Sequence, residues 1–211
     1  MKVLIVGGVA GGAGTAARLR RNDETAEIVM FEKGPYISFA NCGLPYYIGG
    51  VITEKEKLQL QTPESFHARF DVDVRVNSKV VAVDTAAKQV TVRKVLTGEE
   101  YTESYDTLVL SPGASPVRPP IKGIEKAKVF TLRNIPDTYA IKDYVDSQKP
   151  RTAAVIGGGF IGVEMAENLQ EAGVQVSIIE AQSHIMANLD EDMTHDLHNH
   201  IRSKGVKLCL N

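Results

Sequence analysis

Cys42 is the side chain in this sequence whose chemistry is easiest to specify. It lies in the segment Ser38-Phe-Ala-Asn-Cys-Gly-Leu-Pro, with no second cysteine nearby to form an internal disulfide. A thiolate attacks disulfide sulfur, and a short helix beginning near Cys42 would favour the thiolate form. The alternative is that Cys42 is a small buried apolar residue, as most free cysteines are. The other cysteine, Cys209, lies in the apolar run 206–210 and is expected to have only that packing role.

A glycine-rich turn, Gly157-Gly-Gly159-Phe-Ile-Gly162, follows an apolar run and precedes a helical pattern. In this context the first glycine permits a tight turn and the second lets the backbone approach a pyrophosphate. The third lets the helix pack closely on the strand, and the N–H groups at the start of that helix face the phosphates. Glu180 stands 23 positions after Gly157, where a carboxylate accepts from a ribose 2′-hydroxyl and repels a 2′-phosphate. The pattern predicts NADH binding in preference to NADPH.

Another glycine-rich turn lies at the N-terminus and is the first in chain order, with Gly7 first and Gly12 last, but Val9 holds the middle glycine position. Glu32 follows Gly7 by 25 positions and ends an apolar run. A tight turn without a ligand is the alternative. Because strand, turn, helix and acid occur in the expected order, we expect a dinucleotide here too. Two such units in one chain predict FAD in the first and NAD in the second.

The elements that must position these residues alternate between strand and helix. Val3–Val6 is a predicted buried strand, 12–21 a helix and Glu27–Glu32 a second strand. From Val72 to Tyr105 apolar and polar residues alternate, in VDVRV, VVAVD and KQVTVRKVL, which predicts an antiparallel meander with a turn at 97–99. Leu108–Leu110 returns to a buried strand.

The pattern restarts after a proline-rich connection at 115–123, with strand 153–156, helix 160–172 and strand 174–180. The predicted fold class is therefore α/β, with two Rossmann-like, three-layer FAD- and NAD(P)-binding domains. The first, at 1–120, contains the meander as an insertion, and the second begins at 121 and runs to 211. Both are expected to be incomplete, with the C-terminal part of the enzyme missing.

Composition excludes several other classes of protein. The 211 residues are 43% hydrophobic and 24% charged, and a formal net charge of −2 gives no reason to expect a nucleic acid or an anionic membrane as partner. No signal peptide or membrane span is expected, so the predicted location is the cytoplasm, and no metal site is expected.

Seven segments together resemble the coenzyme A-disulfide reductases and the related NAD(P)H-dependent persulfide or polysulfide reductases. They are GGVAGG, FEK, SFANCGLPYYIGG, TPESF, ESYDTLVLSPGAS, FTLRN and GGGFIGVE. Both groups of reductases are single-cysteine flavoproteins of the pyridine nucleotide-disulfide oxidoreductase superfamily. The resemblance implies that NADH reduces the flavin and that electrons then pass to sulfur at Cys42, the redox-active centre, which cycles between a thiol and a mixed disulfide with coenzyme A.

The resemblance also implies roles for other residues. Substrate contacts are expected from Ser38 and Asn41 at the sulfur and from Arg18 and Arg21 at the coenzyme A phosphates, although a solvated helix face is the alternative for the arginines. The residues expected to line FAD are Gly7, Gly12, Glu32, Lys33, Ser111, Gly113 and Arg133. Phe160 is expected to cover the nicotinamide pocket, with Glu164 near the same stack.

Three other functions remain open at this stage. NADH oxidases or peroxidases of the superfamily resemble the chain around Cys42, but they usually carry His where this chain has Ala10. A flavin reductase of a small iron–sulfur carrier would have no need of Cys42 in this setting. A redox-responsive module would use nucleotides only as ligands. Thiol dependence of NADH oxidation separates the sulfur reductase and the oxidase or peroxidase from the flavin reductase of an iron–sulfur carrier. Absence of NADH oxidation would leave the redox-responsive module.

Length is the main departure from the family pattern. Relatives run to more than twice this chain, so the closing strands, the segment that returns to FAD and the interface domain of a homodimer are expected elsewhere. Some relatives also carry a C-terminal rhodanese domain. Residues 1–211 alone are expected not to turn over.

Overall fold

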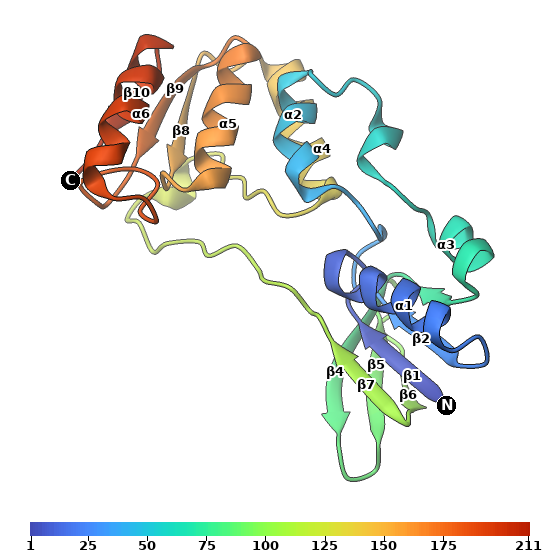
Figure 1. Cartoon of the computed structure of the whole chain (residues 1–211). Coiled ribbons are helices and arrows are strands. Elements are labelled where there is room, and N and C mark those ends of the chain that lie inside the picture. The colour runs from blue at the N-terminus through green and yellow to red at the C-terminus, as the bar shows by residue number, and fades with distance from the viewer. The chain divides into compact units, whose positions relative to one another are not determined.

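The computed structural model describes all 211 residues, which form two compact units. The first contains Met1–Ala40 and Gln59–Ser115, and the second contains Asn41–Leu58 and Pro116–Asn211. Each unit is built on its own parallel sheet (Figure 1).

The sheet of the first unit has four parallel strands in the order β3-β2-β1-β7. Their bounds are β1 (Lys2–Val6), β2 (Glu27–Phe31), β3 (Asp73–Arg75) and β7 (Thr107–Leu110). The central strands are buried on both faces, which explains why the runs at 3–6 and 28–31 are continuously apolar. The strands end at one edge, where the loops after β1, β2 and β7 come together.

Helices cover one face of this sheet and the meander covers the other, giving three layers. Helices α1 (Ala10–Asn22) and α3 (Pro63–Phe70) belong to the helical side, where Ala13, Ala16 and Phe66 pack with alternate strand residues. On the other side Val90 and Val92 of the meander pack on Leu4 and Phe31. The meander comprises β4 (Ser78–Asp84), β5 (Gln89–Lys94) and β6 (Glu100–Ser104), paired antiparallel.

The segment VDVRV does not belong to the meander, and that part of the prediction is wrong. Its residues form β3, which pairs in parallel with β2 through Val29, Met30 and Phe31. Val72, just before the strand, is fully buried in the core beneath the helices. Apolar and polar residues alternate here because β3 is an edge strand with one face covered, and alternation alone does not distinguish that case from an antiparallel strand. The meander and its turn at Gly98, which has a φ of +76°, are confirmed.

The second unit has a three-stranded parallel sheet in the order β10-β9-β8. The elements run β8 (Thr152–Ile156), α5 (Phe160–Glu171), β9 (Gln175–Ile179), α6 (Glu191–Ser203) and β10 (Lys207–Cys209). Because both crossovers connect neighbouring parallel strands, right-handed connections place α5 and α6 on the same face of the sheet. The predicted strand–helix–strand pattern in this region is confirmed.

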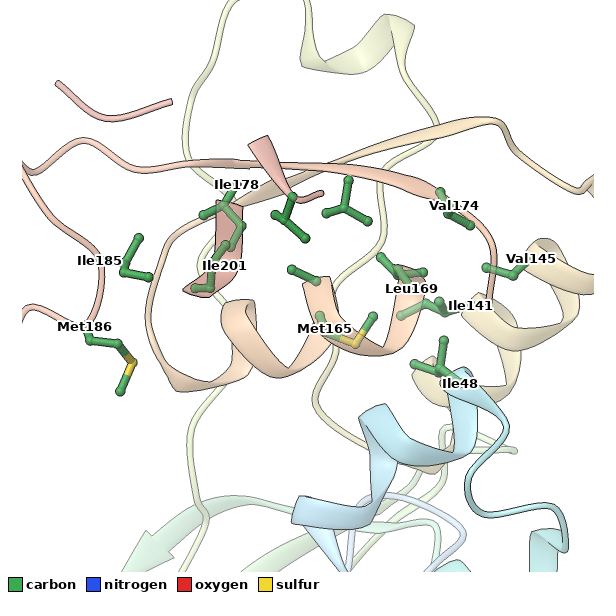
Figure 2. Close-up of a cluster of buried hydrophobic side chains, with 13 residues drawn as sticks. Ile48, Ile141, Val145, Met165, Leu169, Val174, Ile178, Ile185, Met186 and Ile201 are labelled. Carbon is green, nitrogen blue, oxygen red and sulfur yellow. The ribbon is translucent and has the colours of Figure 1, made fainter. Parts of the chain in front are cut away.

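The segment after Cys42 packs within the second unit. It contains a 3₁₀ turn (Asn41–Gly43), α2 (Leu44–Gly49) and a further 3₁₀ turn (Lys55–Leu58). Helix α4 (Ile135–Gln148) and α5 contact α2, and Figure 2 shows Ile48 of α2 beside Ile141 and Leu169 in the core of this unit. A short 3₁₀ turn (Ile124–Lys126) interrupts the connection that leads to α4. No helix of the protein has the length and apolar character that a membrane crossing requires.

Candidate functional site

The second glycine-rich turn joins β8 to α5 and has the backbone geometry that the sequence predicted. Gly157 has a φ of +100°, a conformation that side chains rarely adopt, and Gly159 precedes the first helical residue. A Cβ on Gly162 would overlap the carbonyl oxygen of Gly157, so the third glycine allows the helix to approach the strand. A Cβ on Gly159 would meet nothing within 4 Å, which leaves the backbone there open to a phosphate group.

Glu180 closes this turn from the end of β9. Its Oε2 accepts from the Gly158 N–H at 2.7 Å and its Oε1 accepts from the Gln182 N–H at 2.9 Å. The hydrogen bond from Gly158 is the largest cause that holds the pKa of Glu180 below its ordinary value of 4.5, with Gln182 next. A carboxylate is therefore fixed beside the turn in its charged form.

Two residues of the following loop hold the other side of Gly158, and no motif pointed to them. Ile185 is fully buried, and its Cγ2 lies 2.5 Å from where a Cβ on Gly158 would be. The Met186 N–H donates to the Gly158 carbonyl oxygen at 2.8 Å. Gly158 is thus held at its N–H, its Cα and its carbonyl.

The first glycine-rich turn has the same construction despite Val9. Gly7 has a φ of +103°, and a Cβ on Gly12 would overlap the Gly7 carbonyl oxygen. Glu32, after β2, accepts from the N–H groups of Gly8 and Gly34, each at 2.8 Å.

The loop after Glu32 returns to Gly8 in the same manner. Ile37 is fully buried, with its Cγ2 2.7 Å from a Cβ placed on Gly8, and the Ser38 N–H donates to the Gly8 carbonyl at 2.9 Å. Ser38 has a φ of +45°, and its own carbonyl accepts from Leu60 at 2.9 Å. The backbone of Ser38 therefore fixes the start of the Cys42 segment to the first turn.

Ser111 joins the first turn from the end of β7. Its N–H donates to the Val6 carbonyl at 2.8 Å and its hydroxyl donates to the same oxygen at 3.1 Å. A Cβ on Gly7 would overlap the Ser111 carbonyl, so the glycine is required for this close approach as well as for the turn. Gly113 follows with a φ of +67°. Of the residues expected to line FAD, the structure brings together Gly7, Gly12, Glu32 and Ser111.

The remaining residues of that expected set differ in their settings. Lys33 is exposed directly after Glu32. Arg133 belongs to the second unit, where its backbone N–H donates to Asp137 at 2.9 Å. Phe160 begins α5 with 62% of its surface exposed, and Glu164 lies one turn later on the same face of the helix.

Cys42 is an exposed free thiol in the 3₁₀ turn that leads into α2. The expectation of a short helix beginning near Cys42 is confirmed. Asn41 beside it is also exposed. Cys209 is half-buried on β10 and forms no disulfide.

The arginines of α1 fall into two groups. Arg18 and Arg21 are exposed, as a phosphate-binding role or a solvated face would each require. Arg20 is structural, because its guanidinium donates to backbone carbonyls of the neighbouring loops, including those of Phe70 and Ala26. Sequence alone did not separate Arg20 from its neighbours.

Two parallel sheets, each with a glycine-rich turn closed by a carboxylate, define a protein with two dinucleotide-binding units. The chain belongs to the pyridine nucleotide-disulphide oxidoreductase family, whose model matches residues 1–211.

One curated relative and two solved structures show which members of this family the chain is similar to. The chain is 38% identical over 210 residues to the coenzyme A disulfide reductase of Staphylococcus haemolyticus, covering 100% of this chain and 47% of that protein. It is similar to the crystal structure of reduced Bacillus anthracis CoADR-RHD, with 56% identity and a TM-score of 0.97 over 99% of this chain and 38% of that one. The NAD-dependent persulfide reductase from A. fulgidus is 35% identical, with a TM-score of 0.94 over 100% of this chain and 40% of that one. The chain spans about half the length of the curated relatives it matches.

Proposed function

We propose that the protein uses NAD(P)H and FAD to reduce coenzyme A disulfide, coenzyme A persulfide or polysulfide through the thiol of Cys42. The observation that carries the proposal is the link between Cys42 and the first turn. The Ser38 N–H is bonded to Gly8 of that turn, and four residues later the chain presents an exposed thiol. Four residues of extended chain reach at most about 14 Å, so the thiol is tethered close to whatever the first turn binds.

The two turns fit two dinucleotides. In the first, Gly7, Gly12, Glu32 and Ser111 would hold FAD, with Lys33, Gly113 and Arg133 as further expected contacts. In the second, Gly157, Gly159 and Gly162 would admit the pyrophosphate of NADH at the start of α5, with Phe160 and Glu164 toward the nicotinamide. Bound FAD would carry electrons from NADH to sulfur at Cys42.

The preference for NADH follows from Glu180. Its carboxylate is charged and is held at the turn by two backbone N–H groups. A charged carboxylate accepts from the 2′-hydroxyl of NADH and repels the 2′-phosphate of NADPH. The exposed side chains that directly follow it, Ala181 and Gln182, offer no positive charge to such a phosphate.

The chemistry of the thiol is an exchange reaction. The Cys42 thiolate attacks one sulfur of the substrate disulfide, a bond forms between the two sulfurs, and the other sulfur leaves as a thiolate. Two electrons then cleave the mixed disulfide, which restores Cys42 and releases the second thiol. With a persulfide or polysulfide the leaving group is a sulfide species instead.

The expected substrate contacts have the required exposure. Asn41 neighbours the thiol and is exposed, and Ser38 precedes it at the anchored end of the segment. Arg18 and Arg21 present guanidinium groups to solvent on α1, and planar guanidinium donors match the phosphate groups of coenzyme A. We also propose that the complete protein is a homodimer located in the cytoplasm. Some relatives carry an added rhodanese domain.

The test uses the complete natural protein loaded with FAD. Anaerobic NADH oxidation is measured with coenzyme A persulfide and with coenzyme A disulfide, in wild type, Cys42→Ser and Cys209→Ser. We expect the Cys42→Ser rate to fall by at least about 100-fold, because the attacking thiolate is gone, with flavin still bound. Cys209→Ser, which alters a half-buried packing residue, should keep the wild-type rate.

An equal rate in wild type and Cys42→Ser would remove the thiol from the chemistry and favour an electron-transfer flavoprotein. The ratio of the two wild-type rates identifies the preferred sulfur substrate.

A further inference from the structure

The loop between β9 and α6 fixes the centre of the second glycine-rich turn. Ile185 covers the Cα of Gly158, and the Met186 N–H binds the Gly158 carbonyl. If this loop moves away, Gly158 loses two of the three contacts that orient its peptide groups. The residue that holds the loop therefore controls how well the turn is formed before a dinucleotide arrives.

That residue is His198, in the middle of α6. Its side chain is 7% exposed, and its Nε2 accepts from the backbone N–H of Ile185 at 3.3 Å. Ile185 itself is fully buried, so its N–H depends on this acceptor rather than on water. The contacts run without a break from α6 through Ile185 to Gly158 and Glu180.

Only a neutral imidazole can serve as this acceptor, because both ring nitrogens of a protonated histidine are donors. Burial is the largest cause that lowers the pKa of His198 below 6.5, followed by the charges of Arg202 and His195 on its own helix and of His184 on the loop. The acids of α5 that face α6, Glu167 and Glu171, line a groove with His200 and Lys204 instead.

We propose that His198 is a positioning residue for the NADH-binding turn, and that its neutral imidazole holds the loop of residues 181–190 against Gly158. The inference rests on the proposed binding of NADH at this turn. It adds a proton-sensitive element to that site. Protonating His198 removes the acceptor, releases Ile185 and lowers the fraction of protein whose turn is ready to bind.

The experiment measures NAD⁺ binding to the complete FAD-loaded protein by titration calorimetry across pH, together with amide hydrogen exchange of residues 181–190. Three variants are compared with wild type. His198→Leu removes the acceptor, and His198→Gln supplies a neutral acceptor that does not titrate. His200→Gln is the matched control, because its exposed ring lies on the same helix and lines the groove shared with Glu167 and Glu171 of α5.

At neutral pH we expect His198→Leu to raise the Kd for NAD⁺ about tenfold, with faster exchange in the loop, since a buried N–H loses its partner. His198→Gln should bind like wild type at neutral pH. As the pH falls through the lowered pKa of His198 the wild-type Kd should rise, while the Kd of His198→Gln stays level. His200→Gln should follow wild type throughout.

The inference is overturned if His198→Gln retains the wild-type pH dependence, or if His198→Leu folds and binds NAD⁺ as wild type does. A wild-type protein that binds no NAD⁺ at any pH would overturn the proposed function itself, and the inference with it. The Gln variant keeps the test decisive even if the Leu variant fails to fold.

Discussion

The two glycine-rich turns are built from the same parts at the same spacings from their acids. Glu32 and Glu180 each accept from the N–H of the residue that directly follows the first glycine, Gly8 or Gly158, and from the N–H two positions after the acid. Five positions after each acid comes a fully buried isoleucine, Ile37 or Ile185, that covers Gly8 or Gly158 respectively. The residue after each isoleucine has a positive φ and donates its N–H to that glycine's carbonyl.

The turns differ in what surrounds this shared arrangement of acid, glycine and isoleucine. In the first, the Ser111 carbonyl lies against Gly7, and the chain continues from Ser38 toward Cys42. In the second, a Cβ on Gly157 would meet nothing within 4 Å, and the loop leads into α6, where His198 supports it. The same construction is therefore followed by the thiol-bearing segment in the first turn and by a loop that His198 contacts in the second. We propose that this arrangement forms a dinucleotide site in each unit and that its surroundings give each site a different task.

The largest expected effect comes from filling the space between turn and helix. Gly12→Ala and Gly162→Ala each push a methyl group into a backbone carbonyl, and we expect each to cost about 1–3 kcal/mol of stability. Gly12→Ala should be the more harmful, since its Cβ would also lie 3.1 Å from Ile5. Flavin absorbance and chemical denaturation would show loss of FAD in Gly12→Ala, and retention of FAD with weak NADH binding in Gly162→Ala.

Gly14→Ala is the matched control for this pair. Gly14 lies in α1, where a Cβ would meet nothing within 4 Å, so alanine there should be neutral or stabilise by about 0.5–1 kcal/mol. If Gly12→Ala kept its flavin as well as Gly14→Ala does, the close approach in the first turn would have no bearing on binding.

A smaller effect is expected at the acids. Glu180→Gln keeps one acceptor oxygen but loses the charge, and we expect NADH affinity to fall about threefold to tenfold with FAD unaffected. Because hydrogen bonds lower the pKa of Glu180, its contribution to stability is present above pH 4.5 and is lost as the pH falls through the lowered pKa. The Gln variant should lack this part of the acid dependence in thermal unfolding.

Glu32→Gln provides the reciprocal comparison, with FAD affinity reduced and NADH affinity retained. If either acid variant weakened both cofactors equally, the acids would not act on separate sites.

Local patterns made much of this arrangement predictable. A strand, a glycine turn, a helix and an acid are fixed by residues close in sequence, so Gly157–Gly162 and Glu180 could be assigned before the structure was known. The repeated spacing from acid to isoleucine, EKGPYI and EAQSHI, was also present in the sequence. It becomes a signal only when the two halves are aligned by their acids, since an isoleucine in a loop suggests nothing by itself.

Features that depend on distant partners were not predictable. The packing of α2 within the second unit rests on Ile48 joining the core of α4 and α5, and on Gly49 lying against Asn168, more than a hundred residues away. Strand β3 was misassigned because its alternation reflects an edge position rather than antiparallel pairing. His198 has no motif, and its role follows only from the position of the Ile185 N–H.

We propose that two turns of one design hold two different dinucleotides. Native mass spectrometry of the complete protein, purified with its flavin and mixed with NAD⁺, measures this directly. We expect one FAD and one NAD⁺ for each chain, with Gly12→Ala losing the FAD and Gly162→Ala losing the NAD⁺. A chain that carries only one dinucleotide, or NAD⁺ that displaces FAD, would contradict it.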